Sequence, residues 1–93
     1  MSKPVFLQPE NVMAQEVEDE LVLLHLDSEL YIALDAVAKR FWTLALSEES
    51  VSDILDTLES EYEVTRDTVR HDFQIFIQEL ERNNLIAKAS IDN

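Results

Sequence analysis

The pattern that most restricts the fold is a change of hydrophobic periodicity at Asp35. Before this residue, short apolar runs alternate with polar turns, whereas after it apolar residues recur at every third or fourth position. Strands are therefore expected in the first part of the chain and helices in the rest. This order is typical of an α+β domain whose helices pack against one small antiparallel sheet. The 93 residues are enough for one such domain and too few for two.

Three short strands are predicted before Asp35. They cover Val12 to Val17, Leu21 to Leu26 and Leu30 to Leu34. The turns between them, Glu18-Asp19 and Asp27-Ser28-Glu29, consist of polar residues that hydrogen-bond locally. Connections this short imply an antiparallel meander.

Three helices are predicted after the strands. Asp35, Ser50 and Thr65 are suitable N-cap residues, and the apolar stripes that follow them extend to about Leu46, Tyr62 and Asn83. Asn83-Asn84 can end the third helix, since Asn tolerates a left-handed backbone. The prediction is thus a winged helix-turn-helix-like α+β domain, with a three-stranded antiparallel meander followed by three helices.

The ends of the chain are expected to lie outside this domain. Pro4 and Pro9 predict a flexible N-terminal arm over residues 1–10. The domain is expected to cover residues 11–87, with Leu85-Ile86 packing back onto it. Residues 88–93 are expected to form a frayed tail.

The charge of the chain limits its partners. Twenty acidic residues against seven basic ones give a formal net charge of −13. A field of this sign repels phosphate backbones and anionic lipid, so nucleic acid and membrane are not expected partners, and it attracts basic proteins and peptides. The acidity is equally compatible with a role in solubility alone. Because cysteine and an N-terminal apolar run are absent, we expect a cytoplasmic protein.

The sequence offers little for catalysis. There is no cysteine, and the two histidines, His25 and His71, stand outside any recognised catalytic motif. His71 and Asp72 are adjacent, so on a helix their side chains diverge and cannot share a metal ion. Without glycine, a phosphate-binding loop or a dinucleotide fingerprint is excluded. We therefore predict a binding protein and not an enzyme, with no cofactor and no metal site.

The last of the expected strands indicates how the domain binds. A meander has two free edges, and an unpaired edge can accept another chain as an added strand. No charge interrupts Leu30 to Leu34. Alternation places Leu30, Ile32 and Leu34 on one face and Tyr31 and Ala33 on the other. Alternatively one face is simply core, an interpretation that we favour for Leu34 and leave open for Tyr31, Ile32 and Ala33.

A longer set of residues runs in order through most of the chain. It comprises Leu23-Leu24, Leu30-Tyr31-Ile32-Ala33-Leu34-Asp35, Ala38, Phe41-Trp42-Thr43-Leu44, Val51-Ser52-Asp53-Ile54-Leu55, Tyr62-Glu63-Val64, Val69, Asp72-Phe73, Phe76-Ile77, Leu80 and Leu85-Ile86. This set resembles the PqqD family, which includes the precursor-recognition modules of ribosomal peptide natural products, and it covers residues 12–87. Family members commonly have Gly in the turn before the third strand and Asn after that strand. Here the turn is Asp27-Ser28-Glu29, and Asp35 follows the strand.

The resemblance implies that the domain binds the leader segment of a precursor peptide as a strand beside the third strand. The implied groove lies between that strand and the third helix. Its residues are Leu30, Tyr31, Ile32 and Ala33 on the strand and Val69, Asp72, Phe73, Phe76 and Ile77 on the helix. Phe73 and Ile77 lie at the centre of the apolar stripe, where a core role is the alternative, while Val69, Asp72 and Phe76 lie nearer its margins.

The resemblance also implies a second partner, a maturation enzyme such as a leader peptidase or a radical SAM protein. Lasso-peptide systems and radical SAM systems both fit, with a slight preference for the lasso type. The alternative function is a winged-helix regulatory or structural subunit that self-associates or binds another protein or DNA. DNA is disfavoured because the third helix has a net charge near zero. We expect a monomer or a weak dimer.

Overall fold

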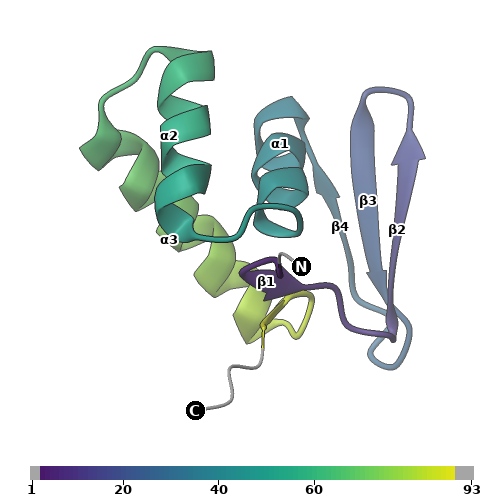
Figure 1. The fold of residues 1–93 in the computed structure, drawn as a ribbon. Coiled ribbons are helices and arrows are strands. Elements are labelled where there is room, and N and C mark those ends of the chain that lie inside the picture. The colour runs from purple at the N-terminus through teal and green to yellow at the C-terminus, as the bar shows by residue number, and fades with distance from the viewer. Residues whose placement is uncertain (1–2, 90–93) are drawn as a thin grey trace.

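A computed structural model describes residues 3–89 and confirms the predicted α+β architecture (Figure 1). The strands β2 (Val12–Val17), β3 (Glu20–His25) and β4 (Tyr31–Leu34) form an antiparallel sheet in the order β2-β3-β4. The helices α1 (Ala36–Ala45), α2 (Val51–Tyr62) and α3 (Arg66–Arg82) follow. Two further short strands, β1 (Phe6–Leu7) and β5 (Ala87–Lys88), pair with each other.

The helices begin at the predicted residues because side chains satisfy their first backbone N–H groups. Asp35 accepts from the Ala38 N–H at 2.9 Å, and Ser50 accepts from the Asp53 N–H at 3.1 Å. Thr65 does the same at the start of α3. Capping of this kind supplies a partner for N–H groups that a helix leaves unpaired at its first turn.

The core lies around α1, which stands between the sheet on one side and α2 and α3 on the other (Figure 1). Leu23 on β3, Ile54 and Leu58 on α2, and Leu80 on α3 are fully buried. Trp42 on α1 is also buried. All three helices lie on one side of the β2-β3-β4 sheet (Figure 1). The sheet therefore has an inner face that packs on helices and an outer face that does not.

The N-terminal segment differs from the flexible arm expected over residues 1–10. Phe6 is buried and meets Phe73 edge to face, with ring centroids 6.2 Å apart. The Val5 N–H donates to the Glu48 carbonyl, and the Val5 carbonyl accepts from the Ala89 N–H, both at 2.9 Å. The arm and the tail thus hold each other in place, which corrects the expectation for Val5–Leu7 and for Lys88. Residues 1–2 and 90–93 lie outside the described residues.

Among residues 3–89 of this glycine-free chain, four take the left-handed backbone conformation. They are Glu18 (φ 57°), Glu29 (φ 62°), Glu63 (φ 52°) and Asn84 (φ 59°). Asn84 follows α3 and ends it as predicted. Glu29 lies in the turn before β4, where the PqqD family commonly has Gly. The turn therefore keeps a left-handed residue although it lacks the residue type that adopts this conformation without steric cost.

Candidate functional site

The free edge of β4 consists of backbone groups of Tyr31 and Ala33. The His25 N–H donates to the Leu30 carbonyl at 2.8 Å, so Leu30, Ile32 and Leu34 direct their backbone groups toward β3. Those of Tyr31 and Ala33 point away from the sheet. Within residues 3–89, no strand pairs with this edge. The donors and acceptors of both residues are thus available to an added strand.

The other edge of the sheet, on β2, is less suited to pairing. The Leu26 N–H donates to the Asn11 carbonyl at 2.8 Å, which sets the register between β2 and β3. In this register the backbone N–H and C=O groups of Ala14 and Glu16 point away from β3, toward the free edge. The Glu16 carboxylate is 2.6 Å from the Lys39 ammonium. Charged side chains on an edge strand discourage the addition of another strand. β4 carries no charge, so the two edges differ in the property that decides pairing.

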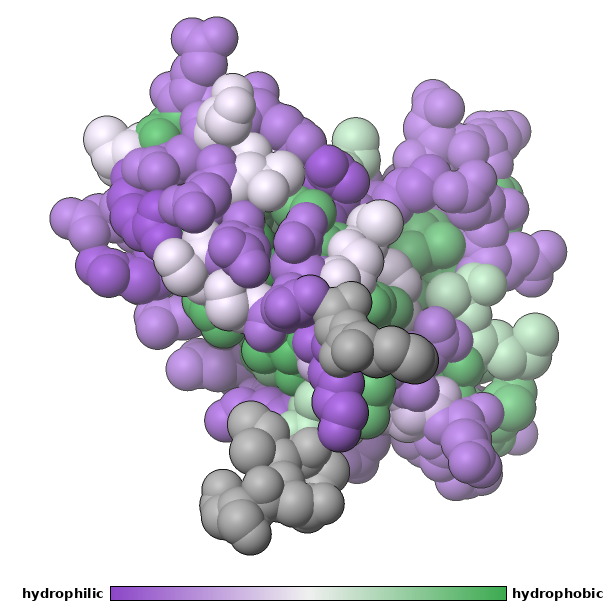
Figure 2. Space-filling model, viewed as in Figure 1, coloured by the Kyte–Doolittle hydropathy of each residue, from purple (hydrophilic) through white to green (hydrophobic). Residues whose placement is uncertain are grey.

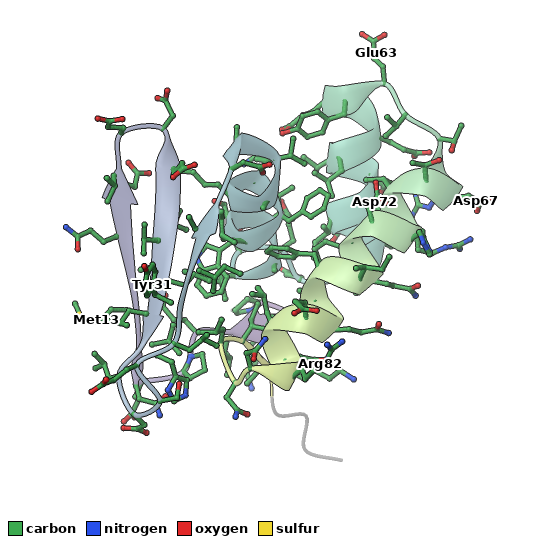
Figure 3. All side chains as sticks on the ribbon, turned by 180° about the vertical axis from the view of Figure 1, so that it is seen from behind. Met13, Tyr31, Glu63, Asp67, Asp72 and Arg82 are labelled. Carbon is green, nitrogen blue, oxygen red and sulfur yellow. The ribbon has the colours of Figure 1, made fainter. Side chains whose placement is uncertain are left out.

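The strand residues predicted for the groove divide between the two faces of the sheet. Ile32 is half-buried and packs against the core, whereas Tyr31 is 70% exposed and lies on the outer face. Figure 3 shows Tyr31 on the sheet and Asp72 beyond α1 on α3. Ala33 shares the outer face with Tyr31, and Leu30 precedes β4 and is exposed. Ile32 therefore directs its side chain toward the helices, whereas those of Tyr31 and Ala33 lie on the opposite face.

The helix residues predicted for the groove lie at different depths. Val69, Phe73 and Ile77 are buried at 3%, 2% and 6% exposure, so the structure places them in the core. Phe76 is half-buried and meets Phe41 of α1 edge to face, with ring centroids 5.4 Å apart. Asp72 is exposed. The α3 side of the candidate site is thus Phe76 and Asp72, with Val69 reaching the surface only through the hollow described next.

An apolar hollow of about 190 Å³ opens between α1 and the start of α3. It is lined by Val37, Phe41, Tyr62, Val64, Thr68, Val69 and Asp72. Val37 comes three residues after the last residue of β4, so this side of the hollow is close to the carboxyl end of that strand. The sequence assigned no groove role to Val37, Tyr62 or Val64. The sequence signal that could have identified them is that all three are hydrophobic and lie at the start of a helix, at its end or in a helix–helix connection.

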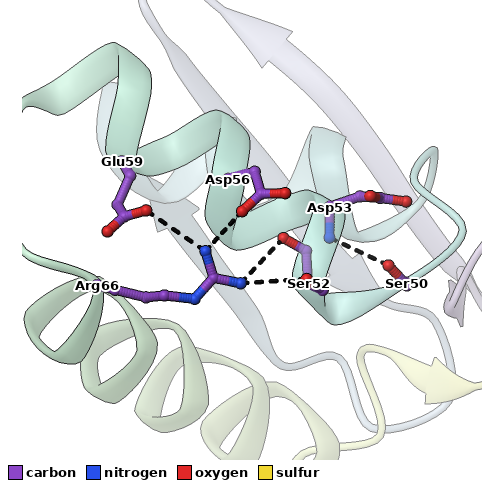
Figure 4. Close-up of polar contacts among 6 residues, drawn as sticks. All are labelled: Ser50, Ser52, Asp53, Asp56, Glu59 and Arg66. Carbon is purple, nitrogen blue, oxygen red and sulfur yellow. Dashed lines mark hydrogen bonds and ion pairs between the residues drawn. The ribbon is translucent and has the colours of Figure 1, made fainter.

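Ion pairs on the surface link the helices that surround this hollow. Arg40 of α1 donates two hydrogen bonds to the Glu61 carboxylate of α2, at 2.9 and 2.5 Å. These bonds lower the pKa of Glu61. Arg66 of α3 bonds to Asp56 at 2.5 Å and reaches Glu59 and Ser52 of α2 (Figure 4), and the Asp56 bond raises the pKa of Arg66. Glu61 and Arg66 stand on either side of the segment from Tyr62, the last residue of α2, through Val64 in the α2–α3 connection.

The part of the chain that the structure describes shows no group of three or more His, Cys, Asp or Glu residues placed to hold a metal ion. None of the three helices there is long and apolar enough to cross a lipid bilayer. His25 is buried, and its Nδ1 accepts from the Ser28 N–H at 3.2 Å. That bond gives His25 a structural role in the turn before β4.

The fold and the site define a small winged-helix-like domain with an open, uncharged strand edge beside an apolar hollow. The chain belongs to the PqqD family, because the model of coenzyme PQQ synthesis protein D matches residues 20–86. A comparison with curated protein sequences gives no match.

Two solved structures are similar to the chain over most of its length. One is described as "TbiB1 in Complex with the TbiA(beta) Leader Peptide". It is 33% identical, covers 90% of this chain and 98% of its own, and has a TM-score of 0.79. The other is described as "Lasso peptide synthetase B1 complexed with the leader peptide". It is 26% identical, covers 87% of this chain and 95% of its own, and has a TM-score of 0.81.

Proposed function

We propose that this protein binds the leader segment of a ribosomally made precursor peptide as an added strand on β4 and presents it to a maturation enzyme. The observation that carries the proposal is the free edge of β4. Tyr31 and Ala33 offer unpaired backbone groups there, on a strand without charged residues. Backbone hydrogen bonds of this kind supply affinity for an extended peptide with little dependence on its sequence.

Selectivity in this proposal comes from the surface beside the edge. Alternate side chains of an added strand face the helices, where Ile32, Phe76 and the hollow offer apolar contacts. Asp72 lines the hollow and supplies a carboxylate for a Lys or Arg of the peptide. The leader peptides in the two similar solved structures support this choice of ligand. The lasso peptide synthetase description supports a lasso-type system.

The protein contributes binding and positioning in this proposal, and the chemistry belongs to the partner enzyme. A leader peptidase or a radical SAM enzyme that acts on the precursor is the class of partner implied. A peptide that is already held in extended form has less conformational freedom to lose, so the entropic cost of orienting it in the enzyme's active site is smaller.

Proline substitution tests strand addition directly. Ala33→Pro removes an N–H that points to the free edge, so the β3–β4 hydrogen bonds stay intact. Ala14→Pro is the matched control, because Ala14 has the same orientation on the β2 edge. Both variants are titrated with a synthetic leader peptide of the precursor encoded beside this protein. We expect Ala33→Pro to bind at least about tenfold more weakly and Ala14→Pro to bind like the parent protein.

Backbone-amide NMR locates the peptide in the same titration. We expect shifts in residues 30–34 and 66–80, together with the residues that line the hollow. Equal losses in the two proline variants, or shifts concentrated on β2, would remove the assignment to the β4 edge. Light scattering over a range of protein concentrations tests the alternative in which this edge pairs with a second copy.

A further inference from the structure

We propose that the outer face of the β2-β3-β4 sheet binds a protein partner with an apolar patch bordered by Lys and Arg, and that this partner is the maturation enzyme. The identity of the partner rests on the proposed function. The surface itself is independent of that function, because it is made of side chains on the outer face, whereas the peptide edge uses backbone groups of β4.

The outer face is apolar and uncovered. Strand alternation and register bring Met13 of β2, Val22 and Leu24 of β3, and Tyr31 of β4 onto this face. Together with Gln15 they line a hollow of about 210 Å³. Met13 is 52% exposed and Val17, farther along the same face, is 48% exposed. Among the described residues, no helix packs on this side of the sheet (Figure 1). Contiguous apolar surface of this kind marks an interaction site more often than isolated exposed residues do.

The borders of this face are acidic. Residues 11–34 contain no Lys or Arg, and their six acids are Glu16, Glu18, Asp19, Glu20, Asp27 and Glu29. Glu18 and Asp19 form the β2–β3 turn, Glu20 begins β3 on the outer face, and Asp27 and Glu29 lie in the turn before β4, whereas Glu16 is on the inner side of β2 and pairs with Lys39. Figure 2 shows hydrophobic side chains on the sheet between hydrophilic ends. The complementary surface is therefore an apolar patch flanked by basic residues.

The same charges argue against other occupants. A second copy of this chain would bring its own acidic turns against these, and no basic side chain of the meander could offset the repulsion. An anionic membrane surface and nucleic acid are repelled for the same reason.

The position of the face fits an enzyme that acts on the bound peptide. Tyr31 and Ala33 belong to both surfaces, since their backbone groups form the free edge and their side chains lie on the outer face. A strand added at that edge extends the sheet, and its alternate side chains emerge beside Tyr31. A partner on the outer face would therefore stand next to the peptide.

Lysine substitutions on the outer face test the proposal. Met13→Lys removes an exposed apolar contact and adds a charge of the same sign as the predicted border of the partner. Glu20→Lys changes the acidic border on the same face. Leu7→Lys is the matched control, because Leu7 is a strand residue that is 44% exposed and lies in the β1–β5 pair. The probe is the purified maturation enzyme encoded beside this protein, and a separate titration with the leader peptide reports on the β4 edge.

We expect Met13→Lys and Glu20→Lys to weaken enzyme binding at least about tenfold while leader binding and the thermal midpoint stay near parent values. Leu7→Lys should bind the enzyme like the parent. The proposal is overturned if Met13→Lys binds the enzyme normally, if the parent does not bind it, or if sedimentation shows that Met13→Lys dissolves a parent dimer. If the parent binds the enzyme but not the leader peptide, the proposed peptide-binding function is wrong, whereas the proposal that the outer face binds the enzyme still stands.

Discussion

Single residues in left-handed turns carry a steric cost in this protein. Glu18, Glu29 and Glu63 all have positive φ, although each has a Cβ atom that approaches backbone in that conformation. Glu29 directly precedes Leu30, whose carbonyl accepts from His25 and sets the register of β4. The backbone around Glu29 therefore helps to position the free edge.

Replacing Glu29 by glycine should relieve this cost. We expect Glu29→Gly to raise the free energy of unfolding by about 1 kcal/mol, because glycine adopts positive φ freely and the gain exceeds the entropy that it adds to the unfolded chain. Urea denaturation measures the change. Glu29→Ala is the control, since alanine keeps the Cβ atom while removing the charge. Equal stabilisation by both variants would assign the effect to charge and not to backbone conformation.

At the scale of single elements, the first turn of α1 lies beside the candidate peptide site. Val37 lines the apolar hollow and is 44% exposed. Val51 is a close match, because it lies in the first turn of α2 and is 39% exposed, away from that hollow. An acidic residue is tolerated in the first turn of a helix because it interacts favourably with the helix dipole.

We therefore expect Val37→Asp to leave the fold intact and to weaken leader-peptide binding about tenfold, through loss of apolar contact in the hollow. Val51→Asp should bind like the parent protein. Fluorescence anisotropy with a labelled leader peptide gives both affinities, and circular dichroism checks the fold. Normal binding by Val37→Asp would show that the peptide does not reach the hollow.

The β1 strand is short, yet it belongs to the core. Phe6 is 5% exposed and packs against Phe73. We expect Phe6→Ala to lower the free energy of unfolding by about 3 kcal/mol, as is usual for a buried aromatic residue. Leu7→Ala, on the exposed side of the same strand, should change it by much less. Similar small losses in both variants would mean that the N-terminal segment is docked only weakly in solution.

For the molecule as a whole, the net charge of −13 opposes compaction. Lys39, Arg40, Arg66, Arg70 and Arg82 each pair with a carboxylate, so they offset only part of the acidic excess. Salt screens repulsion between surface charges once their separation exceeds the Debye length, which is about 10 Å at 0.1 M.

We therefore expect the thermal midpoint to rise when NaCl is increased from about 20 mM to about 300 mM. A variant with neutral residues in the β2–β3 turn and at the first residue of β3, Glu18→Gln, Asp19→Asn and Glu20→Gln, should be more stable at low salt and respond less to added salt. Scanning calorimetry measures both series. A midpoint that falls with salt would show that the surface ion pairs contribute more than the repulsion.

Much of the fold is predictable because its signals are local. Asp35, Ser50 and Thr65 cap helices with their own side chains, and Asn84 ends α3 with its own backbone preference. The change of periodicity at Asp35 separates sheet from helices for a similar reason, since each pattern reflects which side chains of one element meet the core. The uncharged strand ending in Leu34 was also visible in the sequence.

The sequence by itself thus determined the class of fold, the order of the three main strands and three helices, and the strand whose edge is the candidate peptide site. Only the tertiary structure decided that Phe6 is core, that Val69, Phe73 and Ile77 are buried, and that Tyr31 lies on the outer face, away from Phe76. The physical reason is the distance along the chain over which each interaction acts. Capping and periodicity act within a few residues, whereas burial, the β1–β5 pairing and the hollow around Val37 arise when distant segments pack together.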